Sequence, residues 1–119
     1  MISIFIVDDE PVLHRLYRDI LEFNGYRVIA EAYDGEEAVR IFAGLVNKPD
    51  IILMDYRMPK MNGLEAMEAI LKIDPNAKIV FASADDSIED KVKECGAFSF
   101  IAKPFRINPL LQTIKEIEE

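Results

Sequence analysis

Cysteine, histidine and tryptophan are nearly missing from this sequence, which has one, one and none of them in 119 residues. The single cysteine, Cys95, excludes an internal disulfide, which fits a reducing compartment. The N-terminus shows neither a basic segment nor a small-residue cleavage site, so we find no secretory signal and expect a cytoplasmic protein. No apolar run reaches the roughly 18 residues of a membrane span.

Positive charge is also scarce. The 14 lysines and arginines face 22 acidic residues, which gives a net charge of -8. This balance argues against direct binding of nucleic acid or of an anionic membrane, because both require a basic patch. It permits metal cations and basic protein surfaces as partners. The chain length and a hydrophobic content of 50% predict a single domain over residues 1–119.

Phosphate-binding loops and the common catalytic sets are missing as well. Neither G-x-x-x-x-G-K-[ST] nor G-x-G-x-x-G occurs, so a nucleotide is not the obvious ligand. His14 lies within a predicted helix, and we interpret it as a packing or surface residue rather than a catalyst. Cys95 falls on the apolar side of another predicted helix, and we expect it in the core. No Ser-His-Asp or Cys-His set can be assembled.

What the sequence does contain is a regular alternation of apolar segments and helical patterns. The apolar segments predict strands over residues 2–7, 26–31, 51–54, 79–82 and 98–102. The helical patterns begin near Pro11, Asp34, Asn62, Asp85 and Asn108. This alternation predicts an α/β fold, a doubly wound five-stranded parallel sheet in a three-layer sandwich with five helices.

The first of these helices has clear boundaries. Asp9 or Glu10 can cap it, and Pro11 suits its first turn. Asn24 and Gly25 end it. Its apolar residues have the spacing of a helical stripe: Val12, Leu13, Leu16, Ile20, Leu21 and Phe23.

Polar residues follow four of the five predicted strands. Asp8 and Asp9 end the first strand, Asp55 the third, Ser83 the fourth and Lys103 the fifth. The second strand ends in nothing comparable, which favours the strand order 2-1-3-4-5 with the second strand at an edge. The first and third strands then flank the switch point at which such sheets bind ligands, so the polar side chains converge there.

This set of side chains suits one kind of chemistry. Three carboxylates in one cleft repel one another unless a cation occupies the site, and oxygen ligands favour Mg²⁺ first and Mn²⁺ second. An aspartate such as Asp55 can accept a phosphoryl group, while Lys103 neutralises its oxygens and Ser83 donates a hydrogen bond. Simpler interpretations remain open, namely a helix cap for Asp8 and Asp9 and a solvated charge for Lys103.

Four motifs, in order and spacing over the whole chain, resemble those of response-regulator receiver domains, whose fold is CheY-like. They are Asp8-Asp9, Asp55-x-x-Met58-Pro59, Ser83-Ala84 and Lys103-Pro104-Phe105. The resemblance implies that Asp55 becomes an aspartyl phosphate, with a histidine kinase or a histidine phosphotransfer protein as the donor. It also implies a cis peptide between Lys103 and Pro104.

The resemblance further assigns roles to the residues around Asp55. Asp9 and Asp55 ligate Mg²⁺ directly, Asp8 acts mainly through water, and the backbone carbonyl of Arg57 completes the protein ligands. Ser83 and Lys103 hold the phosphoryl group.

The resemblance also implies a switch. Phe100 occupies the position of an aromatic residue that rotates after the Ser83 hydroxyl moves inward, and simple core packing is the plainer interpretation of Phe100. The responding surface is the fourth helix, fifth strand and fifth helix, which bind a downstream target or an output domain absent from this chain. We also expect Arg57 and Asp85 to pair across the mouth of the cleft and to hinder the water that hydrolyses the phosphate.

Two alternatives belong to other functional classes. One is a magnesium-dependent phosphatase-type hydrolase with an aspartate nucleophile, but such enzymes usually carry an acid two residues after the nucleophile, where this chain has Arg57. The other is a receiver-like module that only binds proteins, against which the intact acid set counts. We therefore expect a signalling receiver that catalyses its own phosphotransfer and slow dephosphorylation, rather than a separate enzyme.

Overall fold

A computed structural model describes residues 1–103 and 107–118, and the predicted sheet is present in it. Its strands are β1 (Ser3–Val7), β2 (Arg27–Ala32), β3 (Ile51–Met54), β4 (Ile79–Ser83) and β5 (Ser99–Ala102). All neighbouring strands pair in parallel, in the order β2-β1-β3-β4-β5. The predicted fold class and strand order are therefore confirmed, and β1 and β3 flank the switch point.

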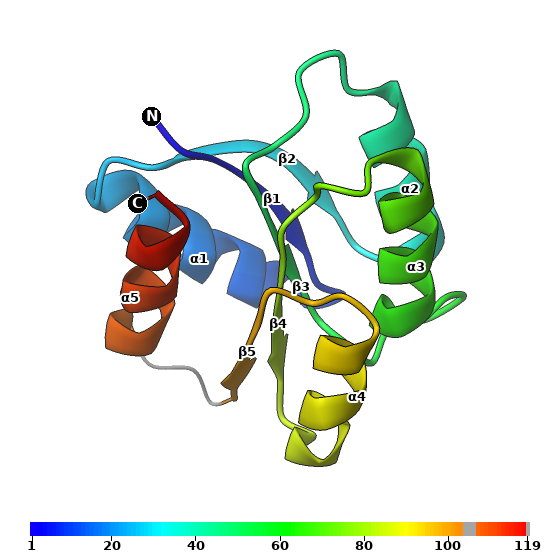
Figure 1. Ribbon diagram of the computed structural model, residues 1–119. Helices are drawn as coiled ribbons and strands as arrows, with labels where there is room; N and C mark the ends of the chain where they lie inside the picture. The colour runs from blue at the N-terminus through cyan, green and yellow to red at the C-terminus, as the bar shows by residue number, and fades with distance from the viewer. Residues whose placement is uncertain (104–106, 119) are drawn as a thin grey trace.

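Helices cover both faces of this sheet. They are α1 (Pro11–Phe23), α2 (Gly35–Gly44), α3 (Gly63–Ile73), α4 (Glu89–Glu94) and α5 (Ile107–Glu118). Figure 1 shows α1 and α5 on one face and α2, α3 and α4 on the other. Each face has its own hydrophobic cluster, so the sheet forms the middle of three layers. Within the described residues, no helix combines the length and apolar character needed to cross a membrane.

The helix starts follow from side chains that accept backbone N–H groups. Asp34 accepts from the Glu37 amide at the start of α2, and Asn62 forms a reciprocal capping box with Glu65 at the start of α3. The expected cap of α1 is wrong, because Glu10 is the N-cap residue but its side chain makes no capping hydrogen bond. Asp8 instead accepts the Glu10 amide at 2.9 Å, which fixes the loop rather than the first helical turn.

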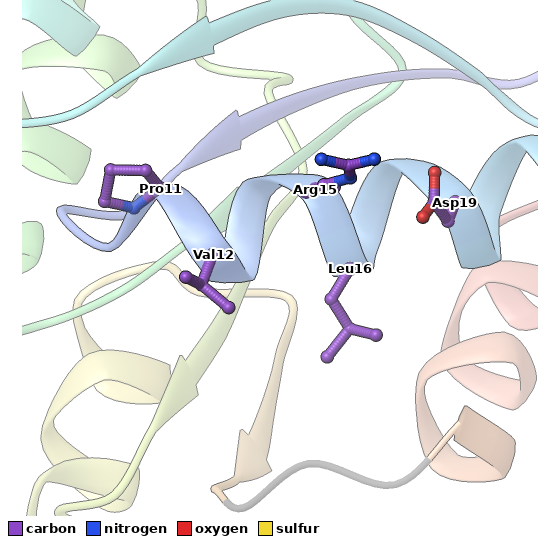
Figure 2. Close-up of a pocket in the computed structure, with 5 residues that line it drawn as sticks. All are labelled: Pro11, Val12, Arg15, Leu16 and Asp19. Atoms are coloured by element: carbon purple, nitrogen blue, oxygen red, sulfur yellow. The ribbon is translucent and has the colours of Figure 1, made fainter.

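The apolar stripe of α1 does not face the sheet as a unit. Val12 is 77% exposed and Phe23 is 90% exposed. Figure 2 shows Val12 and Leu16 projecting from the same side of the helix, along an open pocket. The buried residues of α1 are His14, Tyr17 and Leu21, spaced three and four apart. The helix is thus turned so that a histidine and a tyrosine pack inward while three apolar side chains, Val12, Leu16 and Phe23, meet solvent.

The region of α4 also differs from expectation. A 3₁₀ turn over Asp86–Ile88 precedes the six-residue α4, and Val92 is its buried residue. Cys95 is exposed, which contradicts its predicted place in the core. The reason is local: α4 ends at Glu94, and Gly96 at a φ of 119° turns the chain away from the helical path.

Three smaller predictions concern the C-terminal part of the chain. The last helix begins at Ile107, one residue before the predicted start at Asn108. The predicted cis peptide between Lys103 and Pro104 lies outside the described residues. Phe100 is partly buried and packs against the core on the α2–α3–α4 face, which agrees with its packing interpretation.

Candidate functional site

Asp55 lies directly after β3, at the carboxyl end of the most buried part of the sheet. Its amide donates to the Val7 carbonyl at 2.9 Å, which continues the pairing of β3 with β1 by one residue. The Asp55 side chain turns inward, and the residue is only 8% exposed. Its Oδ1 accepts the Tyr56 amide at 2.8 Å. Among described residues, no hydrogen bond involves the other carboxylate oxygen, Oδ2.

A close backbone approach holds the chain after Asp55. Gly63 opens α3 and donates its amide to the Tyr56 carbonyl at 2.8 Å. A Cβ atom at this position would collide with the Asp55 carbonyl and lie 2.9 Å from the Phe81 ring. Glycine is therefore required here by close approach, and its lack of a side chain fixes where Asp55 sits.

Asp8 is the most constrained acid of the site and is buried. Its amide donates to the Ala32 carbonyl on β2 at 3.1 Å, and its carbonyl accepts from His14 Nε2 at 2.7 Å. Its Oδ1 accepts the Glu10 amide, and its Oδ2 accepts Lys103 Nζ at 2.9 Å. Both backbone polar groups and both carboxylate oxygens are therefore bonded, as burial of a charge demands.

Lys103 links the acids from the far side of the cleft. Its amide donates to the Ser83 carbonyl at 2.8 Å, so β5 positions it beside β4. Its Nζ lies 2.9 Å from Asp8 Oδ2 and 3.6 Å from Asp55 Oδ1. The ammonium thus bridges two carboxylates that would otherwise repel each other.

The pKa of Asp55 reflects this environment. Burial raises the pKa of Asp55 to about 6, because desolvation disfavours the charged form. The Lys103 ammonium opposes this rise, and the negative charges of Asp8 and Asp9 add to it. The Asp55 carboxyl group therefore ionises near pH 6, well above the usual range of an aspartate. Shifts of this kind are typical of functional sites.

The other wall of the cleft comes from the loop after β4. Ser83 is buried, and its Oγ accepts the Asp85 amide at 3.1 Å. Arg57 Nη2 lies 3.3 Å from Asp85 Oδ2, so the predicted pairing across the mouth is present. A cavity of about 280 Å³ lies between these groups. It is lined by Asp9, Glu10, Asp55, Arg57, Ser83, Ala84, Asp85 and Lys103.

The three carboxylates that follow β1 fit a hard cation. Ligand atoms of Asp8, Asp9 and Glu10 all lie within 4.8 Å of one another. Oxygen donors of this kind suit Mg²⁺, which keeps several waters and takes few carboxylates. Glu10 was missed as a member of this group because the sequence pattern assigned it to a helix cap. The third consecutive acid in the sequence was the signal available.

The sequence-predicted residues thus converge from four strands. Asp8, Asp55, Ser83 and Lys103 meet at the carboxyl ends of β1, β3, β4 and β5, and Asp9 lines the same cavity. An ammonium and a hydroxyl therefore line the same cavity as the buried Asp55 carboxylate, whose Oδ2 takes no hydrogen bond from the described residues. The arrangement can bind an anionic group against Asp55 if a cation offsets the acids.

The model of the response regulator receiver domain family matches residues 4–115 of the chain. The chain belongs to this family. The chemotaxis protein CheY of Thermotoga maritima is 39% identical over 118 residues, covering 98% of this chain and 97% of that protein. The likeness therefore spans essentially the whole of both proteins.

Two solved structures extend the similarity to three dimensions. The first is the CheX–CheY–BeF₃–Mg²⁺ complex of Borrelia burgdorferi, with a TM-score of 0.93, 30% identity, and coverage of 99% of this chain and 90% of that one. The second is the response regulator TrrA of Thermotoga maritima in complex with Mg²⁺–BeF, with a TM-score of 0.86, 31% identity and coverage of 98% and 99%. This receiver domain thus shares the CheY-like fold, and the hydrolase and binding-only alternatives are not favoured.

Proposed function

We propose that this receiver domain accepts a phosphoryl group on Asp55 from a phosphohistidine. The donor is a histidine kinase or a histidine phosphotransfer protein. One observation carries the proposal: the buried Asp55 carboxylate faces Lys103 Nζ at 3.6 Å in a cavity that Ser83 also lines. A nucleophile, a cation for the phosphoryl oxygens and a hydroxyl donor are thereby within reach of one bound group.

The reaction depends on a divalent cation, Mg²⁺ in the first place and Mn²⁺ as a substitute. Asp9, Asp55 and the Arg57 backbone carbonyl would hold it directly, and Asp8 would act mainly through water. When bound, the cation offsets the charge of the acids and of the phosphoryl oxygens. The Mg²⁺–BeF complexes of the two related structures support this choice.

The chain's own residues then divide the work. An oxygen of the ionised Asp55 carboxylate forms the new O–P bond as the N–P bond to the donor histidine breaks. Lys103 exchanges its contact with Asp55 for one with a phosphoryl oxygen, while keeping Asp8 as its other partner. The Ser83 hydroxyl donates a hydrogen bond to a second phosphoryl oxygen. The domain thus catalyses its own phosphotransfer and, with water as acceptor, its own slow dephosphorylation.

The signal leaves through the surface of α4, β5 and α5. The inward movement of Ser83 makes room for Phe100, which stands beside Phe81 in the β4–β5 register. Residues 1–119 act as one receiver domain in this scheme. The partner on that surface is a downstream target protein or an output domain, and the net charge of -8 argues against direct contact with nucleic acid or an anionic membrane.

The test is phosphorylation by acetyl phosphate, followed by intact-protein mass spectrometry. We expect the wild-type protein to gain one phosphoryl group with Mg²⁺ and none with EDTA. Asp55→Asn should gain none, because the amide is not a nucleophile for this step. Lys103→Ala should be modified far more slowly while it still binds Mg²⁺. A phosphoryl group that persists in Asp55→Asn would place the acceptor elsewhere and refute the proposal.

A further inference from the structure

His14 makes contacts that a simple packing residue does not need. It is 2% exposed, on the first turns of α1. Its Nε2 lies 2.7 Å from the Asp8 carbonyl, and its Nδ1 lies 3.1 Å from Glu31 Oε1 on β2. A carbonyl oxygen only accepts, so Nε2 must carry a proton and donate it. The imidazole therefore ties the end of β1 to β2 through a side chain of α1.

The ring itself is held from two further directions. Tyr33 stacks on it with ring centroids 4.1 Å apart and an interplanar angle of 26°. Arg18 donates to the other oxygen of Glu31 at 2.6 Å, so the carboxylate has one donor on each oxygen. Although burial alone would raise it, hydrogen bonds from Arg18 and His14 lower the pKa of Glu31. Glu31 is thus an ionised anchor that orients the ring.

The Asp8 carbonyl matters because Asp9 follows it. The orientation of that carbonyl sets the plane of the Asp8–Asp9 peptide, and therefore the origin of the Asp9 side chain. Within the part of the chain that the structure describes, no side-chain hydrogen bond or ion pair holds Asp9. The position of its carboxylate thus depends on its backbone. Among residues 1–103 and 107–118, His14 is the one residue whose side chain bonds that peptide.

We infer that His14, oriented by Glu31, is a positioning residue for the acid pair Asp8–Asp9. It touches neither the phosphoryl group nor the cation, and it acts by fixing the peptide that presents Asp9 to them. The inference rests on the proposed function, since it concerns the cation affinity of the same site. Groups that orient metal-ligating residues in this way typically govern metal affinity by about tenfold or more.

A matched pair of substitutions separates the two contacts of the ring. In His14→Gln the amide nitrogen is as many bonds from Cβ as Nε2, so it can still donate to the Asp8 carbonyl. In His14→Asn the amide reaches only the position of Nδ1, so the contact with Glu31 survives and the contact with Asp8 is lost. Both variants lose the ring stacked on Tyr33. The two variants therefore keep opposite contacts, Asp8 in His14→Gln and Glu31 in His14→Asn, and a weaker site in His14→Asn than in His14→Gln is the result that the Asp8 contact predicts.

Mg²⁺ titration by calorimetry, with no phosphodonor, is the first measurement. We expect His14→Asn to raise the Kd for Mg²⁺ about tenfold and His14→Gln to stay within about twofold of the wild type. Equal Kd values for the two variants, whether normal or raised, would overturn the inference. Should His14→Asn fail to fold, Glu31→Gln, which keeps the ring but weakens its anchor, must still raise the Kd, by less than tenfold.

NMR on the metal-free protein provides a readout that no cation or phosphodonor enters. The Nε2 proton of His14 should be visible in slow exchange, and the Asp9 and Glu10 amide shifts should move more in His14→Asn than in His14→Gln. A fast-exchanging Nε2 proton would contradict the inference in the wild type itself. Normal phosphorylation of Asp55 with unchanged Mg²⁺ affinity in His14→Asn sinks this inference alone. Absent phosphorylation with the expected NMR differences sinks the phosphoacceptor role alone.

Discussion

The two walls of the cleft are held in different ways. We call the wall formed by Asp8 and Asp9 the acid wall, and the wall formed by Ser83 and Asp85 the hydroxyl wall. On the acid wall, the hydrogen bonds of Asp8 reach β2, α1 and β5, and Asp8 itself is buried. On the hydroxyl wall, Ser83 bonds the Asp85 amide, and Asp85 bonds the Ser87 amide and hydroxyl, each only two residues away. Bonds to distant elements hold Asp8, whereas the Ser83 hydroxyl is bonded within its own loop.

The two walls therefore differ in how easily they can move. Moving Asp8 would break contacts to three other elements, so its geometry is as stable as the core. Moving the Ser83 hydroxyl and the turn after it would break short local bonds next to a six-residue helix with one buried side chain, Val92. A phosphoryl group that draws Ser83 inward therefore works against a region with little packing to lose. The proposed output surface begins in this region.

The greatest loss of stability should come from disturbing the close packing of Gly63 against the backbone of Asp55. Gly63→Ala places a methyl group against the Asp55 carbonyl and the Phe81 ring, where backbone must move. We expect a loss of about 3 kcal/mol in the free energy of unfolding, measured by urea titration, and slower phosphorylation by acetyl phosphate.

Gly44→Ala is the matched control, because a Cβ there meets nothing within 4 Å. At the last residue of α2 it should stabilise the protein by about 0.5 kcal/mol and leave phosphorylation unchanged. Similar unfolding curves for the two alanine variants would show that the backbone around Gly63 and Asp55 can move as easily as the hydroxyl wall.

The next effect concerns the charge of the Asp55 carboxylate, which lies beside the acid wall. The folded pKa of Asp55 is about 6, above its usual value, so the folded state holds this proton more tightly than the unfolded state does. Its contribution to stability is therefore greatest below about pH 4 and is lost as the pH rises through about 6. Asp55→Asn has no such loss. We expect this variant to be about 2 kcal/mol more stable than the wild type near pH 8, measured by urea unfolding in EDTA.

The difference between the two proteins should shrink steadily as the pH falls toward 4. Saturating Mg²⁺ should also reduce it, because the cation stabilises the ionised wild-type site and has less affinity for the variant. A difference that does not vary between about pH 5 and 8 would mean that Asp55 ionises as it does in solvent.

The sequence predicted most of the fold because its signals are local. Short apolar segments and turn residues mark all five strands, and polar residues at their ends indicate the order of the sheet. The residues of the site followed from the same fact: Asp8, Asp55, Ser83 and Lys103 each end a strand, and parallel strands end at one edge. Chemistry at strand ends is therefore readable before the structure is known.

What the sequence did not predict depends on contacts between distant elements. The inward face of α1 is set by packing, so His14 and Tyr17 are buried while Val12 and Phe23 are exposed. A count of apolar residues favoured the opposite face. The role inferred for His14 needs Glu31, 17 positions away on another element, and no local pattern joins the two. Cys95 was misplaced because the end of a short helix decides its exposure.

The smallest effect on stability concerns the ion pair of Arg57 and Asp85, which also provides the most direct test of the hydroxyl wall. Arg57 is 78% exposed in its side chain and lies 3.3 Å from Asp85. The hydrogen bonds from Ser87 and Arg57 lower the pKa of Asp85, so its carboxylate stays ionised through the neutral range. Replacing both residues by alanine should leave the urea midpoint unchanged, because exposed ion pairs contribute little.

The same double replacement should shorten the lifetime of the phosphorylated protein, since Arg57 and Asp85 line the cavity and we expect their pair to hinder water that approaches Asp55. Lifetimes are measured by mass spectrometry after removal of acetyl phosphate. Lys93→Ala is the control, because it breaks an exposed ion pair with Glu89 on α4, away from the residues that line the cavity. An unchanged lifetime in the double variant would show that water reaches the phosphate by another path. A shorter lifetime with an unchanged urea midpoint would show that the Arg57–Asp85 pair slows hydrolysis of the phosphate without contributing to the stability of the fold.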